Sequence, residues 1–253
     1  MQQFLDTALK AARAADEVSM AYYRGDFDVE IKEDQTPVTI ADRRAEETIR
    51  GILLDAFPGH GFYGEESGRR GADADYLWLV DPIDGTKSFV AGYGMWSTQI
   101  ALMHRGELVL GVSSAPAAGE TAWAARGLGA HLGETRIHVS RQDRLQDASV
   151  STGNLGTMAR SPRWNVLGRI LARVNRTRGY GDYYHYHRLA AGQVDAVIES
   201  DVNVLDIAAL AVIVREAGGV FTDLEGRPPG LETTSVLAAT PGLHGLLLDM
   251  FNQ

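Results

Sequence analysis

A predicted buried strand that ends in two carboxylates restricts the fold of this chain more than any other feature of its sequence. Residues 76–80 form an apolar run, and Asp81 and Asp84 follow it directly. Pro82 restricts the backbone between the two acids, so both carboxylates can point at one site. Adjacent carboxylates repel each other unless a cation lies between them, and oxygen ligands suit hard cations such as Mg²⁺. The pattern therefore indicates a metal site at a strand tip.

The residues that follow offer an anion site beside those acids. Gly85 and Thr86 precede a plausible helix start, where unpaired backbone N–H groups and a hydroxyl can receive phosphate oxygens. A simpler interpretation is a strand-to-helix turn in which Asp84 only caps the helix. A second acidic cluster, Gly64-Glu65-Glu66-Ser67, lies just upstream and weakens the simpler interpretation, because the intervening loop can bring the two clusters together.

A third acidic position lies far away in the sequence. Residues 205–217 are apolar almost all round and are followed by two glycines, which is typical of a buried helix, and Asp206 lies in its first turn. Taken alone, Asp206 would simply complement the helix dipole, a contribution of about 0.3–1 kcal/mol. The three acidic motifs, found in this order, are a much more specific sequence signal than any one of them alone.

Together these motifs resemble the inositol monophosphatase superfamily of Mg²⁺-dependent phosphatases. The likeness covers roughly residues 4–245 and includes Lys32 and the Pro-Val-Thr-x-x-Asp element that ends at Asp42. The resemblance implies a mixed α+β and α/β chain in a layered αβαβα sandwich of the inositol monophosphatase and fructose-1,6-bisphosphatase type. It also implies a homodimer that acts on a small phosphorylated metabolite.

The resemblance implies a metal-ligand set and two or three Mg²⁺ ions per active site. A first metal would be held by Glu65, Asp81 and the backbone carbonyl of Ile83. A second would be held by Asp81, Asp84 and Asp206. Glu65 also counts among the catalytic residues. Because the chain has no cysteine, a thiolate nucleophile is excluded. An aspartyl-phosphate route is conceivable, but the resemblance commits both strand-tip aspartates to metal.

The resemblance also implies which residues have catalytic and phosphate-binding roles. Thr86, hydrogen-bonded to Asp42, matches the pair that orients the attacking water. The backbone of Gly85 and Thr86 would receive phosphate oxygens, and Glu199 matches a position that contacts the polar part of the substrate. The full substrate-binding prediction comprises Asp84, Gly85, Thr86, Lys87, Asp182 and Glu199.

The choice of substrate depends on a few of these positions. Asp-Gly-Thr-Lys-Ser-Phe and the Arg-Gly-x-Gly-Asp element that ends at Asp182 resemble the histidinol-phosphate phosphatases of the superfamily. Carboxylates at Asp182 and Glu199 suit a substrate with an ammonium group and an imidazole better than an uncharged polyol. Capping of helix 183–192 is the simpler role for Asp182. Alternatives are a broad inositol-1-monophosphatase and, from another class, a non-catalytic metal-dependent binding protein.

Composition bounds the remaining possibilities. Of the net charge of −9, residues 1–90 carry 18 acids and 10 bases, so the predicted metal lobe is the acidic one. The 253 residues without a clear linker predict two lobes, 1–140 and 141–253. The arginines of 160–178 are interleaved with a single aromatic residue, Trp164, too few for a row of stacked bases, so no nucleic acid is expected. No apolar run predicts a membrane span, and the absence of cysteine fits the cytoplasm.

Hydrophobic periodicity predicts the elements. The predicted helices are 2–24, 41–56, 161–174, 183–192, 204–217 and 241–250. The predicted strands are 27–32, 76–80, 97–104, 107–114, 120–125, 148–152, 194–199, 219–222 and 235–239. His185 and His187 lie two apart on a predicted helix and point to different sides, so they cannot bind one ion; we expect them at the surface or the pocket rim.

Overall fold

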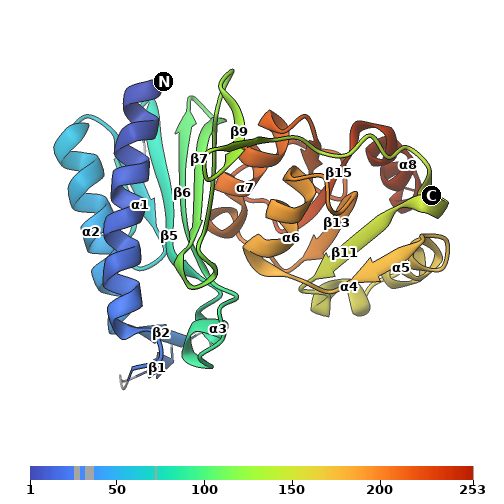
Figure 1. The fold of residues 1–253 in the computed structure, drawn as a ribbon, viewed down its shortest axis with the longest axis horizontal. Coiled ribbons are helices and arrows are strands. Elements are labelled where there is room, and N and C mark those ends of the chain that lie inside the picture. The colour runs from blue at the N-terminus through green and yellow to red at the C-terminus, as the bar shows by residue number, and fades with distance from the viewer. Residues whose placement is uncertain (26–28, 32–36, 72, 253) are drawn as a thin grey trace.

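The computed structural model describes residues 1–25, 29–31, 37–71 and 73–252, which form alternating layers of helix and sheet (Figure 1). The first layer pairs α1 (Gln2–Tyr22) with α2 (Ile40–Ala56). Their buried faces are rich in alanine, which lets the helices approach each other and the sheet closely; an apolar core that includes Leu5, Ile49 and Trp78 fills the contact.

The second layer is an eight-stranded sheet in the order β10-β9-β8-β7-β6-β5-β3-β4. All neighbouring strands run antiparallel except β3 and β5. Along the chain the strands are β3 (Gly61–Gly64), β4 (Gly68–Arg70), β5 (Tyr76–Asp84), β6 (Ser97–His104), β7 (Glu107–Ala115), β8 (Glu120–Ala125), β9 (Gly129–Leu132) and β10 (Thr135–Ile137).

The central helices α6 (Asp182–Ala190) and α7 (Val204–Glu216) lie between this sheet and a second one. Ten residues of α7 are buried, and the largest apolar core combines its side chains with those of both sheets. α7 lies so close to β7 that a Cβ at Gly111 would overlap the backbone of Ala209.

The second sheet has the order β12-β11-β13-β15-β14, and a further apolar core packs α5 and α8 against its outer face. Its strands are β11 (Ser149–Gly153), β12 (Arg176–Arg178), β13 (Ala196–Ser200), β14 (Val220–Thr222) and β15 (Ser235–Ala239). The outer helices are α4 (Gly156–Ala159), α5 (Arg163–Leu171) and α8 (Pro241–Phe251). The remaining short elements are β1 (Val29–Ile31), β2 (Pro37–Thr39), α3 (Thr86–Val90), η1 (Pro116–Ala118) and η2 (Leu145–Asp147).

The layered αβαβα architecture predicted from the sequence is confirmed. The predicted lobe boundary falls between β10 and β11, although the largest core contains residues from both sides of it; the division into lobes stays a prediction. The predicted strand 76–80 is too short, because β5 continues through a bulge to Asp84. Part of the predicted strand 27–32, including Lys32, lies outside the described residues. No helix in the described part of the chain is long and apolar enough to cross a membrane.

Candidate metal centre and substrate cavity

The strand tip holds two acids because β5 bulges where it ends. Asp81 pairs with Gln99 of β6, and after the bulge Asp84 pairs with Ser97. The Ile83 amide donates to Asp81 Oδ1 at 2.9 Å, and the Ser97 hydroxyl donates to Asp84 Oδ2 at 3.3 Å. Both carboxylates are therefore buried and oriented by the strand itself.

Asp206 reaches the same place from the start of α7. Asn203 caps this helix, and its own amide donates to Asp206 Oδ2 at 3.0 Å, which forms a capping box. Each of Asp81, Asp84 and Asp206 offers a carboxylate oxygen within 4.8 Å of the other two. The structure thus brings together three of the predicted metal ligands from two segments far apart in the sequence.

Glu65 approaches from the turn after β3, which runs parallel to β5. Its amide donates to the Val80 carbonyl at 3.2 Å, and its side chain is hydrogen-bonded to Asp81. The turn is held by buried Glu46 of α2, whose carboxylate accepts from the amides of Glu66 at 2.7 Å and Ser67 at 2.9 Å. Glu46 was not predicted from the sequence, although its position one helical turn after Asp42 was the available signal.

The carboxylates of this cluster destabilise one another's charged forms. Burial raises the pKa of Asp81 well above its usual range, and Glu65, Asp84 and Asp206 raise it further. Burial likewise raises the pKa of Asp84 well above its usual range, followed by the negative charges of Asp182, Asp206 and Glu199. Burial raises the pKa of Asp206 to about 7.

A bound cation would remove this repulsion. Within the described chain, no lysine or arginine forms an ion pair with Asp81, Asp84 or Asp206. The oxygen donors are all of the hard type that Mg²⁺ binds. The residues present therefore fit a divalent cation, as the sequence predicts.

Thr86 and Asp42 lie next to each other, as predicted. Asp42 Oδ2 accepts from the Thr39 amide at 2.8 Å and the Thr39 hydroxyl at 2.6 Å in a second capping box, which leaves Oδ1 3.4 Å from the Thr86 hydroxyl. The same hydroxyl lies 3.1 Å from the Ile83 carbonyl. Burial raises the pKa of Asp42, although the hydrogen bonds from Thr39 oppose the shift.

Gly85 and Lys87 flank Thr86 at the start of α3. Gly85 adopts a φ of 86°, and a Cβ there would lie 2.6 Å from the Met95 carbonyl oxygen, so glycine is required on both counts. The first amides of a helix have no intrahelical acceptor. The amides of Ser88 and Phe89 donate to the Gly85 carbonyl, which leaves those of Thr86 and Lys87 available to an anion. Lys87 is exposed.

A small cavity of about 20 Å³ joins the metal cluster to the predicted specificity residues. It is lined by Asp84, Asn154, Asp182, Tyr186, Glu199, Val202, Asp206, Ile207 and Leu210. Glu199 Oε2 accepts from the Tyr186 hydroxyl at 2.6 Å and lies 3.2 Å from His185 Nε2. Its Oε1 is buried and has no hydrogen-bond partner among the described residues.

Asp182 does not have the simpler capping role. It is the first residue of α6 rather than its N-cap, and its side chain makes no capping hydrogen bond. Burial raises the pKa of Asp182 to about 6, and the charge of Glu199 contributes to the shift. Asp182 is therefore free to face a ligand.

The prediction that His185 and His187 lie at the surface or the pocket rim is wrong, because both side chains are fully buried. α6 lies between two sheets, so both of its sides are covered (Figure 1). The two rings do point in different directions, as their spacing requires: His185 contacts Glu199, and His187 Nε2 lies 2.9 Å from the Ser113 hydroxyl.

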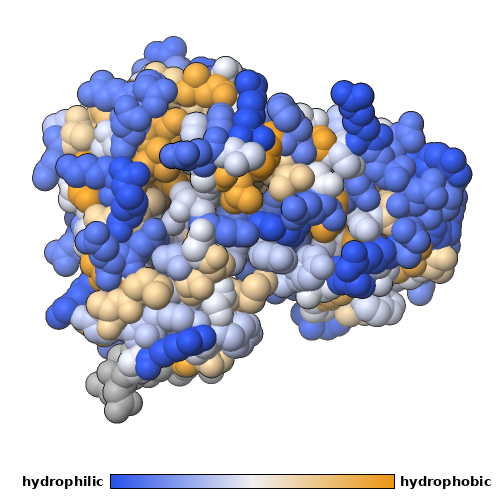
Figure 2. All heavy atoms as spheres, viewed as in Figure 1, coloured by the Kyte–Doolittle hydropathy of each residue, from blue (hydrophilic) through white to orange (hydrophobic). Residues whose placement is uncertain are grey.

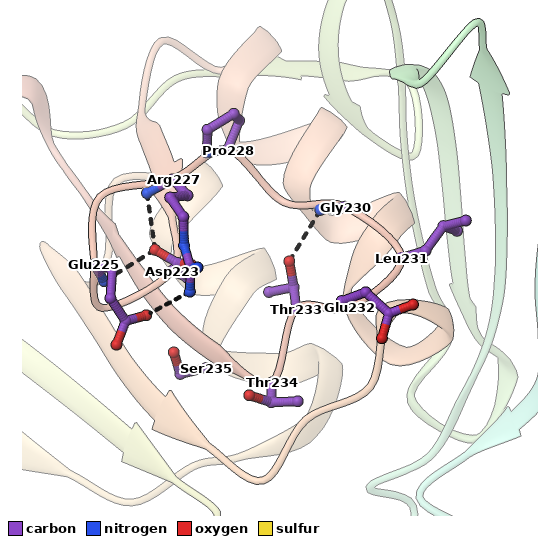
Figure 3. Close-up of a pocket in the computed structure, with 10 residues that line it drawn as sticks. All are labelled: Asp223, Glu225, Arg227, Pro228, Gly230, Leu231, Glu232, Thr233, Thr234 and Ser235. Carbon is purple, nitrogen blue, oxygen red and sulfur yellow. Dashed lines mark hydrogen bonds and ion pairs between the residues drawn. The ribbon is translucent and has the colours of Figure 1, made fainter.

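Larger hollows lie outside this cluster. One of about 280 Å³ is lined by ten residues between Asp223 and Ser235 (Figure 3). Its one arginine, Arg227, pairs with Asp223 at 2.6 Å and with Glu225 at 3.1 Å. None of the predicted site residues lines it. The chemistry therefore belongs to the smaller carboxylate cavity.

Comparison with known proteins agrees with this geometry. The profile of the Inositol monophosphatase family matches residues 1–253. The chain belongs to the inositol monophosphatase family. A histidinol-phosphatase of Streptomyces coelicolor is 41% identical over 266 residues, with 100% of this chain and 99% of that protein covered. A histidinol-phosphatase of Mycobacterium tuberculosis is 40% identical over 251 residues, covering 97% of this chain and 96% of that protein.

Solved structures of the family share the fold. The extragenic suppressor protein suhB of Bartonella henselae superposes with a TM-score of 0.90 at 31% identity, covering 99% of each chain. As a member of this metal-dependent family, the chain is a phosphomonoesterase whose substrate is a phosphorylated small molecule. Its buried Asp81 and Asp84, together with part-buried Asp206, can hold the metal.

Proposed function

We propose that this protein is a Mg²⁺-dependent phosphomonoesterase that hydrolyses L-histidinol phosphate to L-histidinol and phosphate. The observation that carries the choice of substrate is the unpartnered Oε1 of buried Glu199, in a cavity that also contains Asp182. Buried carboxylate oxygens need a donor, and a substrate with an ammonium group and an imidazole supplies one. The names of the most similar relatives support the same substrate.

The metal would be held by the acids around the strand tip. Glu65, Asp81 and the Ile83 carbonyl would bind one Mg²⁺ ion, and Asp81, Asp84 and Asp206 a second. When bound, such ions lower the pKa of a coordinated water and neutralise the charge that develops on the ester oxygen. Burial of the cluster strengthens these electrostatic effects.

Thr86 and Asp42 would act on the attacking water. The Thr86 hydroxyl lies within reach of Asp42 Oδ1, so it can accept a hydrogen bond from the water while donating its own proton toward that carboxylate. This arrangement directs a lone pair of the water at phosphorus. The water oxygen would form a bond to phosphorus and lose a proton as the P–O bond to the alcohol breaks, and the alcohol oxygen would take up a proton.

The remaining predicted residues would bind the two ends of the substrate. Amides of Gly85 and Thr86 would donate to phosphate oxygens, and exposed Lys87 would add a positive charge at the entrance. Asp182 and Glu199 would accept from the cationic end. His185 and Tyr186 hold Glu199 through its Oε2, which leaves Oε1 without a hydrogen-bond partner among the described residues.

The test is phosphate release from a panel of monoesters in Mg²⁺. We expect histidinol phosphate to give the highest kcat/KM. A higher value for inositol-1-phosphate would favour the broad inositol-1-monophosphatase. Absence of release from every monoester would favour the non-catalytic metal-dependent binding protein. Magnesium as the physiological ion, the homodimer and the cytoplasmic location stay predictions.

A further inference from the structure

A row of polar side chains crosses the otherwise apolar interface between the eight-stranded sheet and α6. Ser97 and Gln99 are two residues apart on β6, so they share a face, and Gln99 pairs with Ser113 of β7. Farther along the same face lie the apolar residues Ala101 and Met103 of the main core. The side chains of Ser97, Gln99, Ser113 and His187 are all fully buried.

Hydrogen bonds connect this row to Asp84 without a gap. Ser97 Oγ lies 3.3 Å from Asp84 Oδ2, and Gln99 Nε2 lies 2.8 Å from Ser97 Oγ and 3.0 Å from Ser113 Oγ. His187 Nε2 lies 2.9 Å from Ser113 Oγ. At the far end, His187 Nδ1 lies 3.5 Å from Glu120, a part-exposed residue that also accepts from Arg188 at 2.5 Å.

The chemistry of these groups determines which atom donates in each bond. An ionised Asp84 can only accept, so Ser97 must donate to it and must accept from Gln99. The amide nitrogen of Gln99 has a second hydrogen, which goes to Ser113. The single hydroxyl hydrogen of Ser113 is then left for His187 Nε2.

This order of donors and acceptors selects one tautomer of the His187 ring. With Nε2 accepting, the proton lies on Nδ1, where it faces the carboxylate of Glu120. Burial lowers the pKa of His187, which agrees with a neutral ring. The arrangement is energetically unfavourable at one atom: Gln99 Oε1 is buried and has no hydrogen-bond partner among the described residues. The opposite amide orientation would pair that oxygen but would take the Ser97 hydrogen away from Asp84.

We propose that Ser97, Gln99, Ser113 and His187 form a donor chain that holds the Asp84 carboxylate in the orientation needed to bind a divalent cation. These are positioning residues, since none of them reaches the cavity. The proposal rests on the proposed metal-dependent function. Groups that orient metal ligands typically contribute 10–100-fold to metal affinity or activity.

The test is Mg²⁺ binding to the purified protein, measured by calorimetry and by the rise in Tm that Mg²⁺ alone produces. Gln99→Glu preserves the shape but replaces two donors with acceptors, so we expect Mg²⁺ to bind about 10–100-fold more weakly. Ser113→Ala should weaken binding in the same direction. At saturating Mg²⁺ both variants should recover most of kcat with an unchanged KM, because neither touches the substrate.

Two variants separate positioning from packing. Ser114→Ala is the matched control: Ser114 is the next residue of β7, is equally buried, and its hydroxyl bonds to Asp16 at 2.6 Å on the opposite face. It should bind Mg²⁺ like wild type. His187→Gln, which keeps a polar group near the Nε2 position, should retain more Mg²⁺ affinity than His187→Leu.

The outcomes distinguish this proposal from the proposed function. Wild-type Mg²⁺ affinity in folded Gln99→Glu and Ser113→Ala would overturn the donor chain, as would an equal loss in Ser114→Ala. If Gln99→Glu fails to fold, the comparison of Ser113→Ala with Ser114→Ala decides. Weakened Mg²⁺ binding in a protein whose wild type releases no phosphate would support the chain and contradict the phosphatase assignment.

Discussion

Asp42 and Asp206 occupy equivalent positions in two different helices, each as the third residue of a helix that begins with a capping box. In each, Oδ2 accepts from the amide of the N-cap residue, at 2.8 Å in α2 and 3.0 Å in α7. One oxygen of each acid therefore stabilises a helix start, and the other stays available for chemistry. The same local motif orients a predicted catalytic residue and a predicted metal ligand.

Asp84→Asn should lower kcat/KM by more than about 10²-fold, since it removes an anionic metal ligand rather than a group that orients one. Without metal the variant should be at least as stable as wild type, because burial and like charges oppose ionisation of Asp84. Thermal unfolding in EDTA and in Mg²⁺ checks both points. Substantial activity in the variant, or in wild type with excess EDTA, would contradict the metal assignment.

Thr86→Ala should lower kcat by about 10²–10⁴-fold with a smaller change in KM, as expected for loss of acid–base assistance. Thr86→Ser keeps the hydroxyl that faces Asp42 and should retain much more activity. Steady-state kinetics on both variants provides the comparison. Equal impairment would show that the methyl group and its packing matter rather than the proton.

Asp182→Asn should raise KM for histidinol phosphate and leave hydrolysis of inositol-1-phosphate nearly unchanged. Loss of a desolvated charge pair costs about 2–5 kcal/mol, and loss of a partly solvated pair costs less. Because Asp182 makes no capping hydrogen bond, the variant should unfold at a Tm close to that of wild type. The ratio of kcat/KM for the two substrates is the quantity to compare, and an unchanged ratio would remove Asp182 from substrate recognition.

Stability should fall with rising pH because of Asp16, far from the proposed metal ligands in sequence. Burial raises its pKa to about 6, and only a hydrogen bond from Ser114 opposes the shift. The folded state thus favours the protonated acid, so its stabilising effect is complete below pH 4 and is lost as the pH rises through 6. The difference is up to about 3 kcal/mol.

Asp16→Asn should reduce this pH dependence by the share that Asp16 contributes and stabilise the protein at pH 8. Urea unfolding between pH 4 and pH 8 measures it. Asp6→Asn, at an exposed position of the same helix, is the matched control and should behave like wild type. A wild-type pH profile in Asp16→Asn would show that Asp16 ionises normally.

Most helices and strands were predictable because they depend on local patterns, and the layers and the cluster of acids were predictable because their motifs resemble a known family. Apolar periodicity predicted α7, and the family resemblance implied that Asp81, Asp84 and Asp206 share a metal, which agrees with their proximity in the structure. The residue roles that could not be predicted from the sequence depend on tertiary contacts. Glu46 is indistinguishable from a surface glutamate until the turn after Glu65 docks on it.

The prediction that the two histidines of α6 are exposed was wrong for a related reason. Their spacing correctly separated the directions of the two rings, but a polar helix gives no sign that sheets cover both of its sides. The buried partners, Glu199 for His185 and Ser113 for His187, come from other strands. A polar residue can be buried when hydrogen-bond partners from other elements surround it, and the sequence pattern of its own helix does not show those partners.

The central claim is hydrolysis of a cationic phosphate monoester by a carboxylate-held metal, and one measurement tests it most directly. Phosphate release is followed with histidinol phosphate and with inositol-1-phosphate, each in Mg²⁺ and in EDTA. We predict release only in Mg²⁺, with kcat/KM at least about tenfold higher for histidinol phosphate, a difference of about 1.4 kcal/mol. Release in EDTA, or an equal or higher kcat/KM for inositol-1-phosphate, would contradict the account.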